Sequence, residues 1–180
     1  SAGTAKTDSA SCRLKALNPA VEITTATERL TPDNALALLE KCDLAVDASD
    51  NYAARFALAD ACAALRIPLV HGAVKGFIGQ ATVFAPHEGT ACYRCLFPEE
   101  TPMQEEDTAS AAGILGAHAG IIGCIQALEA LKALAGIPSP LRGGLLSADT
   151  LRMRFTVIPL HPSPTCKCRN GGGGGAAMKN

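Results

Sequence analysis

The chain has 180 residues, of which 48% are apolar, and a formal net charge of −1; these values are typical of one globular domain with a real core. So balanced a charge gives no general attraction to nucleic acid or to an anionic membrane, and 4% aromatic residues without tryptophan exclude extensive base stacking. No basic segment followed by an apolar one marks a secretory signal, so the sequence favours a cytosolic protein.

Helix and strand patterns alternate along the chain at lengths typical of an α/β protein. The first helix is expected over about 6–17 and stops before Asn18-Pro19, a pair that breaks helices. The next starts at Thr31, a candidate N-cap, with Pro32 at its first position. Further helices are expected at 51–66 and 111–136, and strands at 21–26, 43–49, 68–74, 76–84, 143–149 and 153–160.

The order of these elements predicts how the strands pair. Strands joined through a helix by short connections pair in parallel with right-handed crossovers. The region from 21 to 74 therefore predicts part of a doubly wound, Rossmann-like, mostly parallel sheet. Gly72, Gly76 and Gly79 leave no room for a helix, so 76–84 is expected to turn back as an antiparallel extension.

The segment 111–136 is apolar enough to raise the question of a membrane span, which needs about 20 apolar residues. Polar side chains interrupt it and Gly136 ends it as a helix cap would, which favours a buried helix. The interrupting residues are His118, Gln126, Glu129 and Lys132. Its glycines lie three or four residues apart, at Gly113, Gly116, Gly120 and Gly123, so one face admits a closely packed neighbour.

Two segments show neither the helical nor the strand periodicity of apolar residues. Residues 98–110 are acidic and contain proline, which predicts a mobile loop. Residues 169–180 include a run of glycines, which predicts a flexible tail or linker.

Eight cysteines in a chain without a secretory signal indicate reduced thiols rather than a disulfide framework. Four of them are scattered through apolar patterns and are expected to be small buried hydrophobic residues. These four are Cys12, Cys42, Cys62 and Cys124.

The other four cysteines form two close pairs, Cys92/Cys95 and Cys166/Cys168. Two pairs complete a structural zinc site of four thiolates, which is closed to water and has no catalytic position. Such a site would clamp the end of the chain to the loop after 76–84. Two unrelated pairs are the alternative, and the tighter Cys-x-Cys spacing leaves His161 open as a substitute ligand.

The string VDASDN ends in Asp50 and Asn51, just after a predicted parallel strand. Ligands bind at that edge of open α/β sheets. A carboxylate there can hold Mg²⁺ against phosphates, and an amide can hydrogen-bond a nucleotide. The alternative is that Asp50 or Ser49 only caps the helix that begins near Asn51.

Several of these motifs occur together in a familiar order. Four strings resemble the ThiF/MoeB/HesA family of ubiquitin-activating (E1-like) enzymes. They are 43–84 (DLAVDASDN…IGQATVF), 92–98 (CYRCLFP), 112–136 (AGILGAHAGIIG…) and 143–155 (GGLLSADTLRMRF). The CYRCLFP context is most similar to its molybdopterin-synthase adenylyltransferase/sulfurtransferase and MoeB members. The resemblance runs from about Arg13 to Cys168, so residues 1–168 are expected to be a partial adenylyltransferase domain and 169–180 the tail.

The resemblance implies an activity. Family members use ATP and Mg²⁺ to adenylate the C-terminal Gly-Gly of a ubiquitin-like sulfur carrier, for molybdopterin synthesis or tRNA thiolation. It places the Mg²⁺-ATP carboxylate on Asp50, the neighbouring nucleotide contact on Asn51, and structural zinc on Cys92, Cys95 and the C-terminal cysteine pair. It also implies a homodimer and a rhodanese domain, fused or separate, for which 169–180 would be the linker.

Three departures from the family pattern stand beside these implications. The family's glycine-rich nucleotide loop, ribose-binding acid and catalytic Arg and Lys have no counterpart in the sequence, so the chain by itself is expected to be inactive. Ala109 stands where sulfurtransferase relatives carry a thioester-forming cysteine, so no catalytic residue is assigned. Relatives end in Cys-x-x-Cys rather than Cys-x-Cys. A non-catalytic, zinc-clamped scaffold or carrier-binding protein is therefore the alternative function.

Overall fold

The structure is a computed structural model that describes residues 3–98, 113–166 and 168. The chain divides into two compact units, Ser1–Leu30 and Thr31–Asn180. Each unit is described by itself.

The first unit contains one helix, α1 (Lys6–Leu17), among its described residues. Asn18 ends it, with its backbone N–H bonded to the carbonyl of Leu14 and its side-chain oxygen accepting from the N–H of Ala20. The predicted helix is confirmed. The predicted strand at 21–26 is wrong: the segment is β-branched, but it pairs with no described strand, and a ladder partner is what makes a strand.

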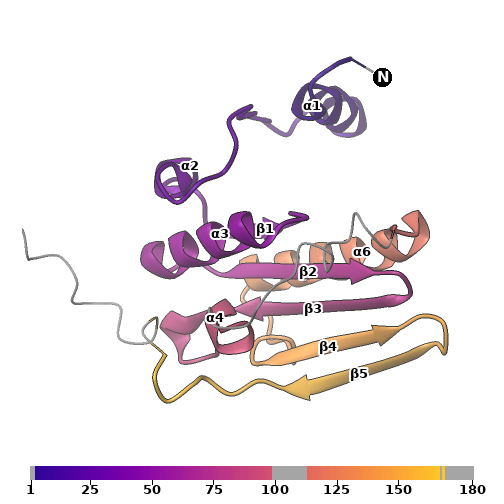
Figure 1. Cartoon of the computed structure of the whole chain (residues 1–180). Helices are drawn as coiled ribbons and strands as arrows, with labels where there is room; N and C mark the ends of the chain where they lie inside the picture. The colour runs from indigo at the N-terminus through magenta and orange to yellow at the C-terminus, as the bar shows by residue number, and fades with distance from the viewer. Residues whose placement is uncertain (1–2, 99–112, 167, 169–180) are drawn as a thin grey trace, which may run out of the picture. The chain divides into compact units, whose positions relative to one another are not determined.

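The second unit is built on a sheet of five strands among the described residues, in the order β1-β2-β3-β4-β5 (Figure 1). Its elements are α2 (Ala35–Leu39), β1 (Ala45–Asp47), α3 (Tyr52–Leu65), β2 (Leu69–Lys75), β3 (Ile78–Phe84), the 3₁₀ turn η1 (Pro86–Glu88), α4 (Tyr93–Leu96), α6 (Gly116–Leu134), β4 (Gly144–Asp149) and β5 (Arg154–Pro159).

The strand pairing corrects one prediction. β1 and β2 pair in parallel, as expected for strands joined through α3, but β2–β3, β3–β4 and β4–β5 are antiparallel. The sheet is therefore mixed and mainly antiparallel, not mostly parallel. A parallel pair needs a crossover, and within the described strands only the β1–α3–β2 connection supplies one. The antiparallel return at 76–84 is confirmed, with Gly76 in the left-handed region at φ 57°.

Helix ends follow from local hydrogen bonds. α2 begins at Ala35, after Asn34, so the predicted start at Thr31 is wrong; the Asn34 side chain instead accepts from the Thr31 N–H at 2.8 Å. α3 begins after Asn51, whose side-chain oxygen accepts from the N–H of Ala54 at 2.9 Å. This cap fixes the turn from β1 into α3.

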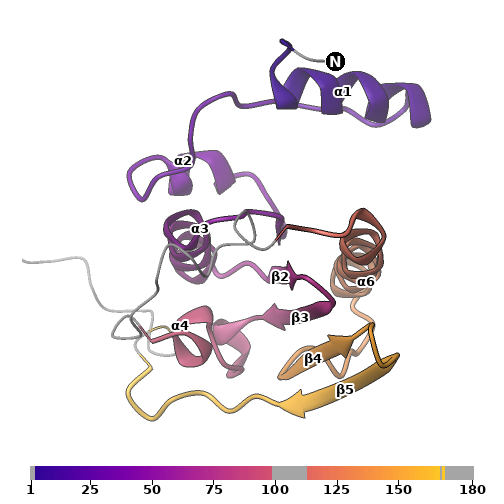
Figure 2. The same ribbon diagram turned by 45° about the vertical axis from the view of Figure 1, so that its right-hand side comes forward.

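One face of the sheet is covered by α6, which contacts β2 and β3 (Figures 1 and 2). Two glycines let the helix approach closely. A Cβ on Gly72 would lie 2.3 Å from the side-chain carbon of Gln126, and one on Gly79 would lie 2.5 Å from His118 Nε2. The core beside this contact is formed by Val70, Ala81, Val83, Leu141 and Leu146.

The outer side of α6 corrects two further predictions. His118, Ile122, Gln126 and Glu129 are buried, but Ile121, Leu128, Leu131 and Leu134 are exposed, so the helix is only half-buried. No neighbour lies near where a Cβ would stand on Gly116, Gly120 or Gly123. The close neighbour expected there is absent from the described part of the chain, and Gly113, also open, lies outside α6. No described helix combines the length and apolarity that a bilayer crossing needs.

The scattered cysteines also differ from expectation. Cys62 on α3 is buried, and burial raises the pKa of its thiol to about 12. Cys12, Cys42 and Cys124 are exposed. Cys12 lies on a helix without buried residues, and Cys124 lies on the exposed side of α6, so apolar surroundings in sequence did not mean burial.

Candidate functional site

The carboxyl end of β1 organises the candidate site. Asp47, the last residue of the strand, is 1% exposed. Its Oδ1 accepts hydrogen bonds from the backbone N–H and the hydroxyl of Ser49, at 2.9 and 2.6 Å. Arg55 on α3 donates to the carbonyl of Ser49 at 2.9 Å. The loop between β1 and α3 is thus held from both sides.

Asp50 and Asn51, predicted from the sequence, lie in this loop. Asp50 is exposed and lines a pocket. Asn51 caps α3, so the cap that the sequence left to Asp50 or Ser49 belongs to Asn51 instead. The Asn51 amide also donates to Asp50 at 3.3 Å. The Asp50 carboxylate is therefore available to a ligand, whereas the Asn51 oxygen is already bonded.

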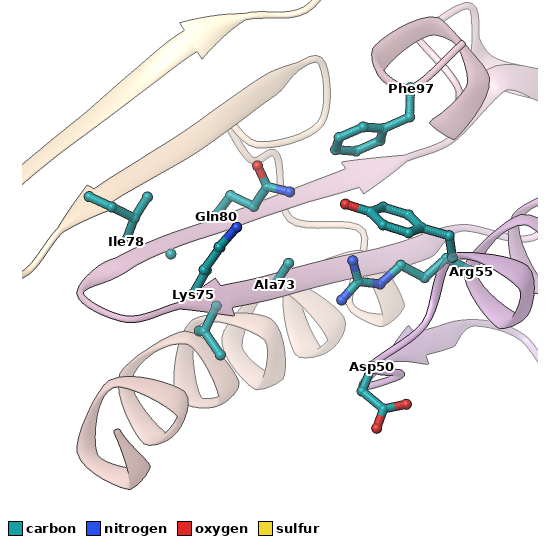
Figure 3. A pocket seen from close by; sticks show the side chains of 10 residues that line it. Asp50, Arg55, Ala73, Lys75, Ile78, Gln80 and Phe97 are labelled. Atoms are coloured by element: carbon teal, nitrogen blue, oxygen red, sulfur yellow. The ribbon is translucent and has the colours of Figure 1, made fainter. Parts of the chain in front are cut away.

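The pocket has a volume of about 170 Å³ and lies between α3, the β2–β3 hairpin and the residue after α4 (Figure 3). Two cationic side chains, Arg55 and Lys75, reach it from opposite walls. Gln80 offers an amide. The other lining residues are Asp50, Tyr52, Ala73, Val74, Ile78, Gly79 and Phe97. A carboxylate, two cations and an amide around an apolar floor suit a polar anionic ligand.

Beneath the pocket lies a buried polar chain that sequence reasoning missed. His71 on β2 is fully buried, and its Nδ1 is 2.7 Å from Asp47 Oδ2. Its Nε2 is 3.4 Å from the amide nitrogen of Gln80. Gln126 of α6 donates to the Asp47 carbonyl at 2.7 Å. One signal of this buried chain was present in the sequence, the histidine inside the apolar strand pattern PLVHGAV.

The charge state of Asp47 follows from its partners. Burial by itself raises the pKa of the carboxyl group, but the hydrogen bonds from His71 and Ser49 outweigh it and hold the pKa below its ordinary value of 3.8. Arg55 adds a third contact, with its Nε 3.7 Å from Asp47 Oδ2. Asp47 is therefore ionised at neutral pH and can only accept hydrogen bonds.

Aromatic side chains enclose the His71 ring. Tyr93 of α4 lies edge-on to it with centroids 5.3 Å apart, and Phe97 and Phe84 lie at 6.3 and 5.9 Å. Tyr93 is 1% exposed, and burial raises its pKa to about 12. The CYRCLFP segment thus packs directly on the polar chain below the pocket.

The same segment carries the predicted metal ligands. Cys92 Sγ lies 3.6 Å from Cys95 Sγ and 3.5 Å from Cys166 Sγ, so residues far apart in sequence converge. Sulfurs bound at 2.3 Å to a tetrahedral zinc ion lie about 3.8 Å apart. The three sulfurs fit that spacing, and among the described His, Cys, Asp and Glu residues they are the group that could hold a metal ion.

Hydrogen bonding within the cluster also fits a cation. Ser163 donates its backbone N–H to Cys95 Sγ at 3.3 Å. The pKa of Cys92 is raised, first by its hydrogen bond with Cys168 and then by burial. Burial and then the Cys95 and Cys92 thiols raise the pKa of Cys166 to about 11. A divalent cation reverses this penalty, because it stabilises thiolates directly.

Cys168 stands apart from the other three. It is hydrogen-bonded to Cys92, which lowers the pKa of the Cys168 thiol, but its sulfur is not within the group of three mutually close atoms. His161, the sequence-based substitute ligand, is exposed and also outside that group.

An ion pair joins this cluster to α3. Arg94, between Cys92 and Cys95, donates to both carboxylate oxygens of Asp60 at 2.8 and 2.6 Å, and its guanidinium lies over the ring of Phe56. The cluster, α3 and the pocket wall are therefore held together.

Some predictions lie outside the described residues. Ala109 and nearly all of the 98–110 loop fall within 99–112, and the tail falls within 169–180.

The sequence matches the ThiF family model over residues 1–170, and the chain belongs to the ThiF family. It is 42% identical to adenylyltransferase and sulfurtransferase MOCS3-2 of Zea mays over 91% of its own length, and 41% identical to the SAMP-activating enzyme E1 of Haloferax volcanii over 94%. It is 42% identical over 86% to the sulfur carrier protein adenylyltransferase of Thermus thermophilus. The chain spans 34%, 63% and 58% of these relatives.

Solved structures show the same fold. The crystal structure of E. coli MccB with succinimide superimposes with a TM-score of 0.72 at 15% identity, over 93% of this chain and 51% of MccB. The structure of PaaA gives a TM-score of 0.68 at 15% identity, over 87% of this chain and 55% of PaaA. The Rossmann-like α/β fold is confirmed at this level.

Proposed function

We propose that the full-length protein containing this chain uses ATP and Mg²⁺ to adenylate the C-terminal Gly-Gly carboxylate of a ubiquitin-like sulfur carrier. Three relatives at 41–42% identity are named as adenylyltransferases or activating enzymes, and one of them as acting on a sulfur carrier. The single observation that carries the proposal is the pocket at the carboxyl end of β1, which Asp50, Arg55 and Lys75 line together.

The chemistry needs these groups. A carboxylate is a poor acyl donor, and transfer of AMP to it creates a good leaving group. Asp50 would hold Mg²⁺, which neutralises phosphate charge when bound. One N–H of the Asn51 amide donates to Asp50, and the second N–H of that group would be a donor for the nucleotide. Arg55 and Lys75 line the pocket as cations that can stabilise the substrate carboxylate and developing negative charge.

The cysteine cluster has a structural part in this proposal. Cys92, Cys95 and Cys166 would hold zinc, with Cys168 as the fourth ligand. A site closed by four thiolates leaves no position for substrate, so its part is to hold the end of the chain beside α4.

We further propose, as the family resemblance implies, a cytosolic homodimer that uses the exposed apolar side of α6. Substitution of Leu131 by Glu would place a charge in that contact. Sedimentation of the full-length protein should show the wild type as a dimer and Leu131→Glu as a monomer, and a monomeric wild type refutes the dimer. The activated carrier would serve molybdopterin synthesis or tRNA thiolation together with a fused or separate rhodanese domain, and exchange assays with each kind of carrier distinguish the two.

The direct test is ATP–pyrophosphate exchange with the full-length protein and a carrier ending in Gly-Gly. Exchange should depend on the carrier, disappear when its last glycine is removed, and fall by at least about 100-fold in Asp50→Ala. Asp43→Ala is the matched control, since Asp43 is exposed just before β1 and does not line the pocket. Absence of exchange, with retained carrier binding, supports the scaffold alternative instead.

A further inference from the structure

Asp47, His71 and Gln80 form a polar chain across three neighbouring strands. Asp47 and His71 are directly paired in the parallel β1–β2 register. In the β2–β3 register His71 pairs with Thr82 and Ala73 pairs with Gln80, so Gln80 is the diagonal neighbour of His71. Diagonal neighbours are within reach of long side chains, and the small Ala73 leaves room for Gln80 to lie towards the imidazole.

The hydrogen-bond roles along this chain are fixed by its buried end. The Asp47 carboxylate can only accept, so His71 donates from Nδ1. In the neutral imidazole Nε2 is then an acceptor. Gln80 faces it with its amide nitrogen at 3.4 Å, which makes Gln80 the donor. The amide oxygen of Gln80 is thereby left as a hydrogen-bond acceptor at the pocket.

The size of the pocket limits what this acceptor meets. Its volume of about 170 Å³ is below the roughly 300–1,000 Å³ usual for pockets that hold a drug-sized ligand. Ala73 and Gly79 are the small residues among its lining, and Lys75 lies beside Gln80 (Figure 3). An extended glycine-rich peptide end, with backbone N–H donors and a terminal carboxylate, matches these features better than a nucleotide base does.

We propose that Asp47 and His71 act as positioning residues that present the Gln80 amide oxygen to a backbone N–H of the carrier's C-terminal tail. This inference rests on the proposed function for the identity of the substrate. It makes Gln80 a determinant of carrier affinity, distinct from the groups around Asp50 that would serve ATP.

Substitutions separate positioning from support of the fold. Gln80→Met keeps the length of the side chain and removes the acceptor. In His71→Asn the side-chain amide can still donate to Asp47 in place of Nδ1, but it is too short to reach Gln80. In His71→Gln the side-chain oxygen can reach the position of Nε2 and accept from Gln80. His118→Asn is the matched control: His118 is buried behind Gly79 on the α6 face, bonded to Thr150, and does not line the pocket.

The assay is steady-state ATP–pyrophosphate exchange by the full-length protein, with the concentrations of ATP and carrier varied separately. Loss of one hydrogen bond should raise the carrier KM about fivefold in Gln80→Met and His71→Asn, with the ATP KM and kcat within about twofold of wild type. His71→Gln should restore the carrier KM, and His118→Asn should leave it unchanged. A rise in the ATP KM instead, an unchanged carrier KM, or the same rise in His118→Asn overturns the proposal.

Nitrogen NMR of ¹⁵N-histidine-labelled protein gives a readout independent of activity. His71 should carry its proton on Nδ1 and show Nε2 as a bonded acceptor, and the Nε2 signal should change in Gln80→Met. A proton on Nε2 alone refutes the positioning even if exchange is normal. Absence of exchange in the wild type refutes the proposed function, and with it the carrier contact, while the NMR result still decides how Gln80 is held.

Discussion

Replacement of Cys166 by serine tests the zinc clamp most directly. The sulfur cluster joins Cys92 to Cys166, which are 74 positions apart. If a metal ion closes this loop, the entropy removed from the unfolded chain corresponds to about 4 kcal/mol in the chain-closure treatment of cross-links. For a protein of this size that loss lowers the melting temperature by roughly 10 °C.

The assay combines metal content with thermal unfolding. Wild-type protein should contain one zinc ion per chain, and Cys166→Ser should lose most of it together with roughly 10 °C of stability. Cys12→Ser is the matched control, since Cys12 is exposed on α1, a helix without buried residues, and its unfolding free energy should stay within about 0.5 kcal/mol of wild type. Cys168→Ser should have a smaller effect than Cys166→Ser, because Cys168 lies outside the group of mutually close sulfurs. Wild-type protein without zinc, or equal melting temperatures for the two variants at Cys166 and Cys12, would show that no ion closes the loop.

Two predictions concern the framework of the pocket. Gly72→Ala should lower the free energy of unfolding by about 3 kcal/mol in urea titrations, because the new Cβ displaces Gln126 from the buried carbonyls of Asp47 and Val70. A Gly72→Ala variant as stable as the wild type contradicts this packing. Asp47→Asn should cost about 2 kcal/mol at pH 7, because charged hydrogen bonds to His71 and Ser49 are lost. The pKa of folded Asp47 lies below 3.8, so the stabilisation from its charge is present above that pH and disappears as the pH falls further. The unfolding free energies of wild type and Asp47→Asn, measured against pH, should therefore converge in acid. A difference that does not change with pH refutes the assignment.

Local signals predicted much of the fold. The spacing of apolar residues and the glycine and asparagine positions identified α1, β1, α3, β2, β3, α6, β4 and β5. The failures share a cause. The segment 21–26 and the exposed side of α6 were judged from side-chain type, whereas strand formation and burial depend on partners that the local sequence does not specify.

The candidate site was only partly predictable. The cysteine spacing indicated the cluster, and VDASDN indicated the edge where Asp50 lies. His71 and Gln80 gave little signal, because their significance comes from the strand register that brings them to Asp47. The sequence likewise could not show that Asn51 caps α3 while Asp50 lines the pocket, because these roles depend on the geometry of the turn.

The short α4 helix has a consequence for protein engineering. Tyr93 lies between Cys92 and Cys95 in the sequence and contacts the His71 ring. Phe97, two residues after Cys95, forms part of the pocket wall. The seven residues CYRCLFP thus contribute both to the cysteine cluster and to the wall of the pocket. Grafting a cysteine motif of another length into this protein would shift the substrate entrance as well, so selection for tighter metal retention and selection for a new carrier would compete for the same few positions.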